Sequence, residues 1–199
     1  MDEKRRRPFR RRYMKDYELQ VELNDDGREV KVARYIGNLY DTGLDDGASL
    51  ALRRRSLSLS LAAAAANAAA LCLRHGAMTS ILAVMPLALA MFPLLYGCMG
   101  SFRLPRRAKL LRSDEVEYGI ERVKRSAPGI AVLGGAGTLG TAIHHLFVHR
   151  TPLGELTWGD GAFLLCCLMV TGCGIGLWRT AAPVKLIERP RQTDWTEAT

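Results

Sequence analysis

Charged side chains are missing from two long stretches of the sequence and almost missing from a third. Residues 126–149 and 161–178 contain no Asp, Glu, Lys or Arg, and residues 56–102 contain only Arg74. A water-soluble fold mixes polar and apolar positions with a period of 2 or 3.6 residues, so blocks of this length exclude an ordinary soluble domain. Because no ionisable residue lies deep in these stretches, an ion-coupled pump is also disfavoured.

Motifs that carry catalysis are missing as well. The sequence contains no H-E-x-x-H, no phosphate-binding loop and no recognisable Ser-His-Asp set. Its five cysteines form no C-x-x-C pair and all lie in apolar stretches, where reduced cysteines act as small packing residues. We therefore expect the protein not to be an enzyme and to need no cofactor.

Four apolar stretches are long enough to cross a membrane, because the hydrocarbon core is about 30 Å thick and needs about 20 helical residues. They cover residues 56–73, 77–102, 127–148 and 161–178. The first stretch is the weakest, since it is rich in Ala and contains the polar Asn67, which we expect to form a hydrogen bond between helices. The sequence predicts an α-helical integral membrane protein with four transmembrane helices.

Basic residues indicate the side on which each connection lies. Residues 1–55 contain 14 Lys and Arg, residues 103–125 contain eight, and residues 179–199 contain four. The other two connections contain one each. Because cytoplasmic loops are enriched in Lys and Arg, both termini and the middle loop are expected in the cytoplasm, with the spans in the plasma membrane.

This topology divides the chain into four parts. We expect a basic disordered extension over residues 1–13, a cytoplasmic β-hairpin region over 14–55, a transmembrane domain over 56–178 with a cytoplasmic loop at 103–126, and a cytoplasmic tail over 179–199. Met14 is an alternative start, and the extension would then be dispensable.

The most basic stretch is KRRRPFRRR, residues 4–12, with seven cations among nine residues. Nucleic acid is one possible partner for such a run. Beside a membrane, the anionic leaflet is the nearer partner, and each cation near its surface contributes ~1 kcal/mol of attraction. We expect contact with anionic lipid headgroups, and no nucleic-acid binding, through these residues: Arg5, Arg6, Arg7, Arg10, Arg11, Arg12, Arg106 and Arg107.

Apolar and polar residues alternate on both sides of Asn24-Asp25-Asp26-Gly27. Asp-Gly between alternating runs favours a β-hairpin. Leu19, Val21 and Leu23 are expected to share one face, and Val30 and Val32 to repeat it on the second strand. Because an isolated hairpin is only marginally stable, we expect it to dock on the membrane surface, on the middle loop or on a partner.

The middle loop predicts a short helix over residues 114–124. Ser113 is expected to cap it, and Glu121 and Arg125 have the i, i+4 spacing of a helical ion pair. Pro128 is then expected in the first turn of the third span, where proline is tolerated.

The third span contains Gly135-Ala136-Gly137-Thr138-Leu139-Gly140, a literal G-x-G-x-x-G, and Glu155 follows Gly135 by 20 residues. A dinucleotide site needs this spacing inside an alternating βαβ sheet, and the flanking sequence contains apolar spans instead. Small residues four apart also allow close helix packing in lipid. We expect the third and fourth spans to pack on each other, or on copies of themselves, through Ala131, Gly135, Ala136, Gly140, Gly172 and Gly176.

Three histidines lie at the outer end of the third span. His145 and His149 are four residues apart, a spacing that could hold a transition metal with Glu155 or Asp160. Histidines also suit the headgroup region without any ligand, and this alternative stays open.

Pro86 and Pro93 are expected to kink the second span, as in helices that line substrate paths.

Several local patterns extend through most of the chain. The hairpin ends in Tyr35-Ile36-Gly37. The second span ends with Met99-Gly100 near its exit and is followed by Leu104-Pro105-Arg106, and residues 122–126 precede the third span. In these features the chain resembles small uncharacterised four-pass membrane proteins of Gram-positive bacteria. The resemblance implies a bacterial plasma membrane and no activity.

Together these features favour a non-enzymatic multi-pass membrane scaffold or accessory subunit with a basic cytoplasmic face. Its expected partner is another membrane protein or a second copy of the chain. The alternative is a small oligomeric transporter or channel for a metal or a small solute, which the prolines, glycines and outer histidines favour.

Overall fold

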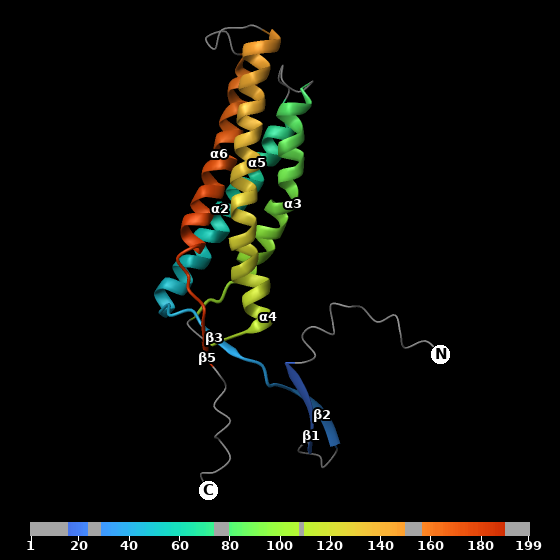
Figure 1. Cartoon of the computed structure of the whole chain (residues 1–199), viewed down its shortest axis with the longest axis vertical. Coiled ribbons are helices and arrows are strands. Elements are labelled where there is room, and N and C mark those ends of the chain that lie inside the picture. Colours follow the sequence, from blue (N-terminus) through green and yellow to red (C-terminus); the bar gives the residue numbers. More distant parts are fainter. Residues whose placement is uncertain (1–15, 24–28, 74–79, 108–109, 150–156, 190–199) are drawn as a thin grey trace, which may run out of the picture.

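The computed structural model describes residues 16–23, 29–73, 80–107, 110–149 and 157–189. Four long helices form one bundle (Figure 1): α2 (Asp46–Cys72), α3 (Ile81–Arg103), α5 (Arg122–Ile143) and α6 (Trp158–Ala181). These helices, with α5 extended at both ends, are long and apolar enough to cross a membrane. The prediction of a mostly helical chain with four such helices and a small N-terminal hairpin is confirmed.

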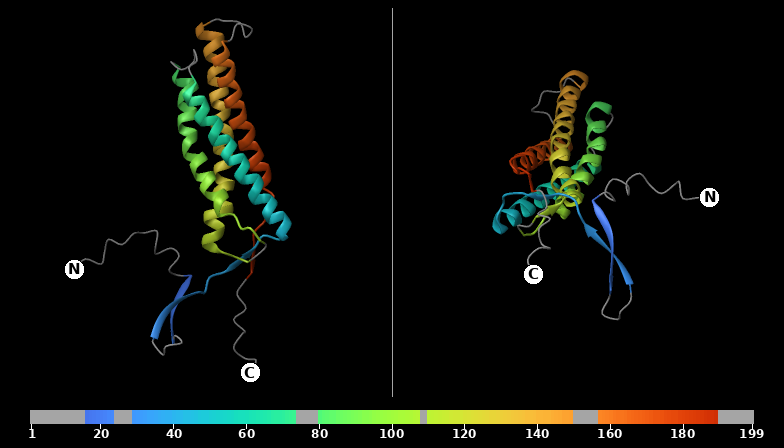
Figure 2. Two further views of the ribbon diagram at one scale, coloured as in Figure 1. Left: turned by 180° about the vertical axis from the view of Figure 1, so that it is seen from behind. Right: turned by 60° about the horizontal axis from the view of Figure 1, so that its bottom comes forward.

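Successive helices of the bundle lie side by side, and α6 closes it against α2 (Figure 2). This is an up-and-down four-helix arrangement, which short connections between antiparallel neighbours produce. The N-terminal segment, the middle connection and the C-terminal segment all reach the same end of the bundle (Figure 1). We call this end the base.

Helix α2 begins ten residues before the apolar stretch that predicted it. The Asp45 carboxylate accepts a hydrogen bond from the Ala48 N–H at 2.6 Å and caps the helix. Asp46 places a second negative charge at the positive end of the helix dipole. At the base, the Arg53 guanidinium donates a hydrogen bond to the Leu104 carbonyl at the end of α3.

The expected middle-loop helix is continuous with the third span. It consists of α4 (Ser113–Val116), the π-helix η2 (Glu117–Glu121) and α5, and a second π-helix, η3 (His144–His149), extends α5 at its far end. The prediction that Pro128 lies in a first helical turn is therefore wrong, because Pro128 is inside α5. Ser113 lies inside α4 rather than at its cap. The Glu121–Arg125 ion pair is confirmed.

Small residues set how closely α5 approaches both of its neighbours. A Cβ atom on Gly174 of α6 would lie 2.5 Å from the Ala131 backbone nitrogen, and one on Gly134 would lie 2.9 Å from the Thr171 nitrogen. On the opposite side, Gly140 lies directly against the Leu82 backbone carbonyl of α3. Side chains at these positions would push the backbones apart.

The predicted glycine face of α5 and α6 is therefore only partly correct within one chain. Ala131 does pack on α6, but Gly140 packs on α3, and Gly176 packs on Leu59 of α2. Gly135 and Gly172 face open space, so neither contacts another helix inside the bundle, and their contact with a second copy of the chain stays a prediction. The reason is the rotation of α5 about its axis. Its buried positions include Gly134, Gly137 and Gly140, so Gly135 faces outward.

Helix α3 also packs through small residues, and its glycines were missed in the sequence. A Cβ atom on Gly97 would lie 2.7 Å from the Ser126 hydroxyl, and one on Gly100 would lie 2.8 Å from the Arg122 Cβ. The Arg122 guanidinium stacks over Tyr96 and Tyr118, at 4.9 and 4.4 Å from the ring centroids. These contacts join α3 to α5 near the base.

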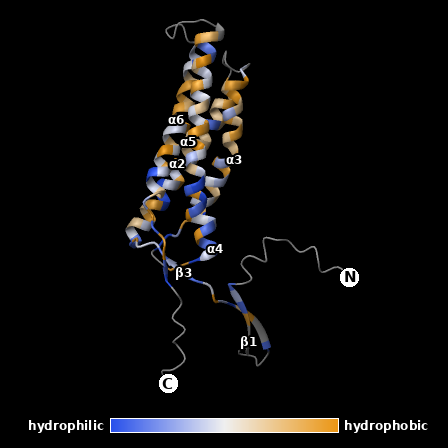
Figure 3. Cartoon of the chain, in the orientation of Figure 1, coloured by the Kyte–Doolittle hydropathy of each residue, from blue (hydrophilic) through white to orange (hydrophobic). Residues whose placement is uncertain are grey.

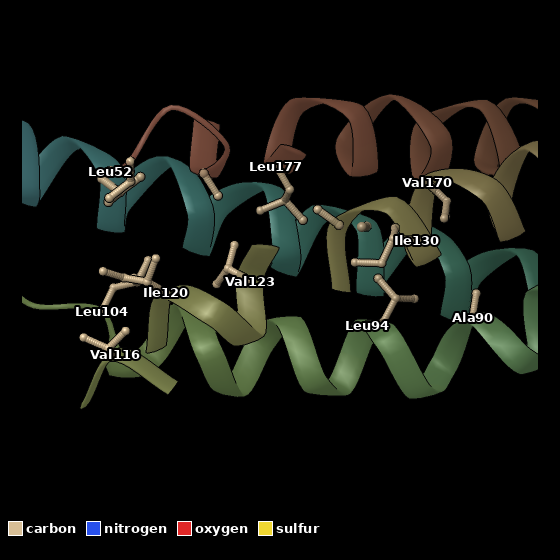
Figure 4. Packing of buried hydrophobic residues seen from close by; sticks show 14 of the residues in the cluster. Leu52, Ala90, Leu94, Leu104, Val116, Ile120, Val123, Ile130, Val170 and Leu177 are labelled. Atoms are coloured by element: carbon tan, nitrogen blue, oxygen red, sulfur yellow. The ribbon is translucent and has the colours of Figure 1, made fainter. Parts of the chain in front are cut away.

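Most of the interior of the bundle is apolar (Figure 4). Leu52 and Leu104 lie at the base end, and Ile130 meets Leu94 farther along the bundle. A second cluster around Phe163 and Leu87 fills the other end. The surface of the helices is also apolar along most of their length, and polar residues gather towards the base (Figure 3).

The predicted hairpin is formed by β1 (Tyr17–Leu23) and β2 (Glu29–Tyr35), paired antiparallel. Leu19 pairs with Ala33, and Val32 pairs with Gln20. Directly paired residues share a face, so Val32 lies on the opposite face from Leu19 and Val21. The expectation of one shared apolar face is wrong, because the register is offset by one residue. The turn at 24–28 lies outside the described residues.

A second, unpredicted sheet lies at the base. Its central strand β3 (Leu39–Asp41) pairs antiparallel with β4 (Leu111–Arg112) of the middle connection and with β5 (Ile187–Arg189) near the C-terminus. We call β3, β4 and β5 the base sheet. Part of the expected tail is therefore ordered, and Val184 between α6 and β5 is buried.

Candidate functional site

Side chains of the hairpin dock on the middle connection, one of the three predicted positions. The Ser113 N–H donates a hydrogen bond to the Tyr35 hydroxyl at 3.0 Å, and the Ser113 hydroxyl donates to the Asp16 carboxylate at 2.9 Å. The Arg112 guanidinium lies 5.4 Å from the centroid of the Tyr35 ring. A hydrogen bond between the Arg112 and Tyr17 side chains raises the pKa of Arg112 above its ordinary value.

Further polar contacts join two strands of the base sheet and hold the segment before β5 to α5. Lys124 of α5 donates a hydrogen bond to the Val184 carbonyl at 2.5 Å. Arg189 of β5 forms an ion pair with Asp41 of β3 at 2.7 Å. The base is therefore a connected structure in which three distant segments hold one another.

The predicted lipid-facing arginines are only partly within the described residues. Arg106 and Arg107 are exposed in the connection after α3, at the base. The other six predicted arginines belong to residues 1–15, outside the described part. Their contact with lipid stays a prediction.

A histidine–aspartate pair lies at the other end of the bundle. His145 and Asp160 are both buried, and the His145 Nε2 atom lies 3.5 Å from Asp160 Oδ1. Asp160 is the third residue of α6, and its N–H donates to the hydroxyl of Thr157, which caps the helix. The His144 ring meets the His145 ring edge-on at 5.8 Å between centroids.

The structure places one of the expected metal ligands next to His145. Asp160 is beside His145, but within the described part of the chain no three His, Cys, Asp or Glu residues are grouped closely enough to hold a metal ion. Glu155 and the side chain of His149 lie outside the described residues. The backbone at His149 is π-helical, so the α-helical i, i+4 geometry assumed for the pair does not apply. Metal binding stays a prediction.

Buried polar groups continue along α2. The Ser60 and Ser101 hydroxyls form a hydrogen bond at 3.0 Å between α2 and α3. Asn67 is fully buried, and within the described residues its side-chain amide has no hydrogen-bond partner. The sequence predicted an interhelical hydrogen bond for Asn67, and the structure does not show one.

Sequence reasoning missed the base sheet, whereas it named both His145 and Asp160. Strands of two or three residues have no period that a sequence could reveal, and only partly buried apolar or aromatic residues such as Tyr40 mark them. Asp160 was visible as the third residue after the capping threonine, Thr157.

The chain matches no protein-family model, and comparisons with curated proteins and with solved structures find no match either.

Proposed function

We propose that the protein is a membrane scaffold whose base presents an ordered surface to a protein partner on the cytoplasmic side. The observation that carries this proposal is the base sheet, in which β3 is hydrogen-bonded between β4 and β5. Three connecting segments that could have been loose loops are joined into one structure. An ordered surface costs a partner less entropy on binding than loops that must first be fixed.

The outward side chains of the bundle support its placement in a lipid bilayer. Large apolar residues face outward along the helices, among them Phe92, Leu95, Val132, Leu139 and Leu165, each at least half exposed. A soluble bundle would place polar residues at such positions. Lipid would cover this surface, leaving the base and the hairpin in water.

We propose that the base faces the cytoplasm, because residues 1–55 contain 14 Lys and Arg and residues 103–125 contain eight. We expect a fluorescent protein fused after residue 199 to fluoresce, and alkaline phosphatase fused there to be inactive, since the phosphatase matures only outside the cytoplasm. Phosphatase fused after residue 156, on the opposite side, is expected to be active. The reverse pattern at both positions would contradict the orientation.

The partner proposal is tested on the full chain, tagged at its C-terminus and extracted from native membranes in mild detergent. We expect a second protein to co-purify in fixed ratio with the wild type. Tyr40→Pro removes a backbone donor from the centre of the base sheet and is expected to reduce that protein at least tenfold. Gly172→Ala, at an open position of α6, is the control that should retain it.

A clean homo-oligomer without a second protein would contradict the scaffold proposal and favour the alternative, a small transporter or channel. The buried pair of His145 and Asp160 is the observation that favours this alternative, because ionisable groups inside helical membrane proteins commonly lie on transport paths.

A further inference from the structure

A groove opens at the base between the start of α2 and the end of α6. These two helix ends lie together in the structure (Figure 1), and the groove between them encloses about 750 Å³. This volume is within the ~300–1,000 Å³ that is typical of small-molecule sites. Leu52, Val184 and Ile187 form part of its apolar wall.

Three cations complete the lining of the groove. They are Arg55 of α2, Arg179 at the end of α6, and Lys185 in the segment that leads to β5, and all three are exposed. Among the described residues that line the groove, none is acidic. The site therefore combines an apolar wall with a threefold positive charge.

Two carboxylates that adjoin lining residues in the sequence are engaged elsewhere. Asp41 accepts a hydrogen bond from the Gly43 N–H and forms an ion pair with Arg189, and Asp45 caps α2. No ion pair within the described chain involves Arg55, Arg179 or Lys185. Their charge is available to a ligand.

The position of the cations matches the boundary of the proposed bilayer. Arg55 directly precedes the apolar stretch that starts at Ser56, and Arg179 directly follows the stretch that ends at Trp178. Both guanidinium groups would therefore lie at the depth of phosphate groups, while the apolar wall beside them could contact an acyl chain. Basic pockets between transmembrane helices on the cytoplasmic side are typical sites for acidic lipid headgroups.

We propose that this groove binds one anionic phospholipid of the cytoplasmic leaflet. The phosphate contacts Arg55, Arg179 and Lys185, and the upper part of an acyl chain lies along Leu52 and Val184. This inference rests on the proposed placement of the base at the cytoplasmic membrane surface. It concerns a defined site rather than the general attraction of the basic segments for the membrane.

The test uses the full chain in mild detergent, stripped of lipid and then titrated with phosphatidylglycerol or phosphatidylcholine, with bound lipid counted by native mass spectrometry. We expect one phosphatidylglycerol per chain to bind in preference to phosphatidylcholine. The variant Arg55→Gln/Arg179→Gln/Lys185→Gln is expected to weaken this binding on the order of 100-fold, about fivefold for each cation.

The matched control removes three other cations from the same end: Arg54→Gln/Arg106→Gln/Arg107→Gln. These residues are all exposed near the base but do not line the groove. The control has the same net charge as the groove variant and is expected to retain the bound lipid. A third variant, Ala51→Trp, fills the groove without changing any charge and is expected to lose it.

The outcomes separate the groove from its alternatives. Equal weakening in the groove variant and the control would overturn the site in favour of diffuse attraction, as would full binding to Ala51→Trp. Displacement of the lipid by glycerol 3-phosphate at equal concentration would show that a free phosphate ester is the ligand. If the triple variant does not fold, Lys185→Gln alone, outside the helices, is expected to weaken binding about fivefold.

The scaffold proposal is tested separately from the groove. Co-purification of the partner with the groove variant would leave the scaffold intact if the lipid result fails. Specific lipid binding without any partner would support the groove and contradict the scaffold.

Discussion

Gly140→Ala is expected to destabilise the bundle by ~3 kcal/mol, at the upper end of the range for overpacking. The added Cβ would collide with the Leu82 carbonyl oxygen and would lie 2.6 Å from the Leu82 carbonyl carbon. Both atoms belong to the backbone, so no side chain can rotate away. Pro86 limits any relief of the collision, because its ring crowds the Leu82 carbonyl from within α3 and it offers this carbonyl no N–H to turn towards.

The prediction is measured as the thermal unfolding midpoint of the purified chain in one detergent. Gly135→Ala and Gly172→Ala are the matched controls, because nothing lies within 4 Å of a Cβ at either position. Both are expected to leave the midpoint unchanged or to raise it, since Ala exceeds Gly in helix propensity by up to ~1 kcal/mol. An unchanged midpoint for Gly140→Ala would show that α3 and α5 are not packed as described.

Asp160→Ala is expected to cost about 2 kcal/mol, because it removes the buried carboxylate beside His145 and leaves the polar ring of His145 buried next to an apolar methyl group. The same change also weakens the cap of α6, where the Asp160 N–H and carboxylate both engage Thr157. Thr157→Ala removes the capping hydroxyl but keeps the carboxylate, and it is expected to cost only ~1 kcal/mol.

A double-mutant cycle isolates the pair. We expect His145→Ala and Asp160→Ala to be destabilising separately, and the double variant to cost less than the sum by at least ~0.5 kcal/mol. The measurement is again the unfolding midpoint, with chemical unfolding to obtain free energies. Additive effects would mean that the two side chains do not interact, which would also remove the main support for the transport alternative.

The four spans could be predicted because their signal is strong and local. A charge-free apolar run of about 18 or more helical residues matches the thickness of the hydrocarbon core, and residues 126–149 and 161–178 are such runs. The ends of the helices could not be predicted in the same way. Asp45 starts α2 in a polar segment, and α4 continues into α5 through a π-helix, a feature without a sequence signature.

Which glycines are buried depends on the rotation of each helix about its axis. The sequence shows glycines at 134, 135, 137 and 140, and several faces can be drawn through them. The correct face follows from the two neighbours of α5, since Gly134 must face α6 while Gly140 faces α3. Two glycines four residues apart indicate a single helix contact. They cannot specify the rotation of α5, because α5 contacts both α3 and α6.

The candidate sites could be predicted only in part, because they depend on how the helices pack. His145 and Asp160 have suitable chemistry, and both were named from the sequence as possible ligands. The groove is lined in part by Arg55 and Lys185, which are 130 residues apart in the sequence. Only the packing of α2 on α6 brings them together, so no local pattern could reveal the site.

The base sheet also determines when the protein can be completed. Asn38, next to β3, forms a hydrogen bond with Glu188 of β5, a residue 150 positions later in the chain. During synthesis β3 emerges early, whereas β5 follows the last of the four apolar helices. The pairing of β3 with β5 must therefore wait until all four helices have been made and α6 has packed on α2. An interrupted chain would contain spans but no finished base, so the partner-binding surface of the proposed scaffold would arise only on fully assembled molecules.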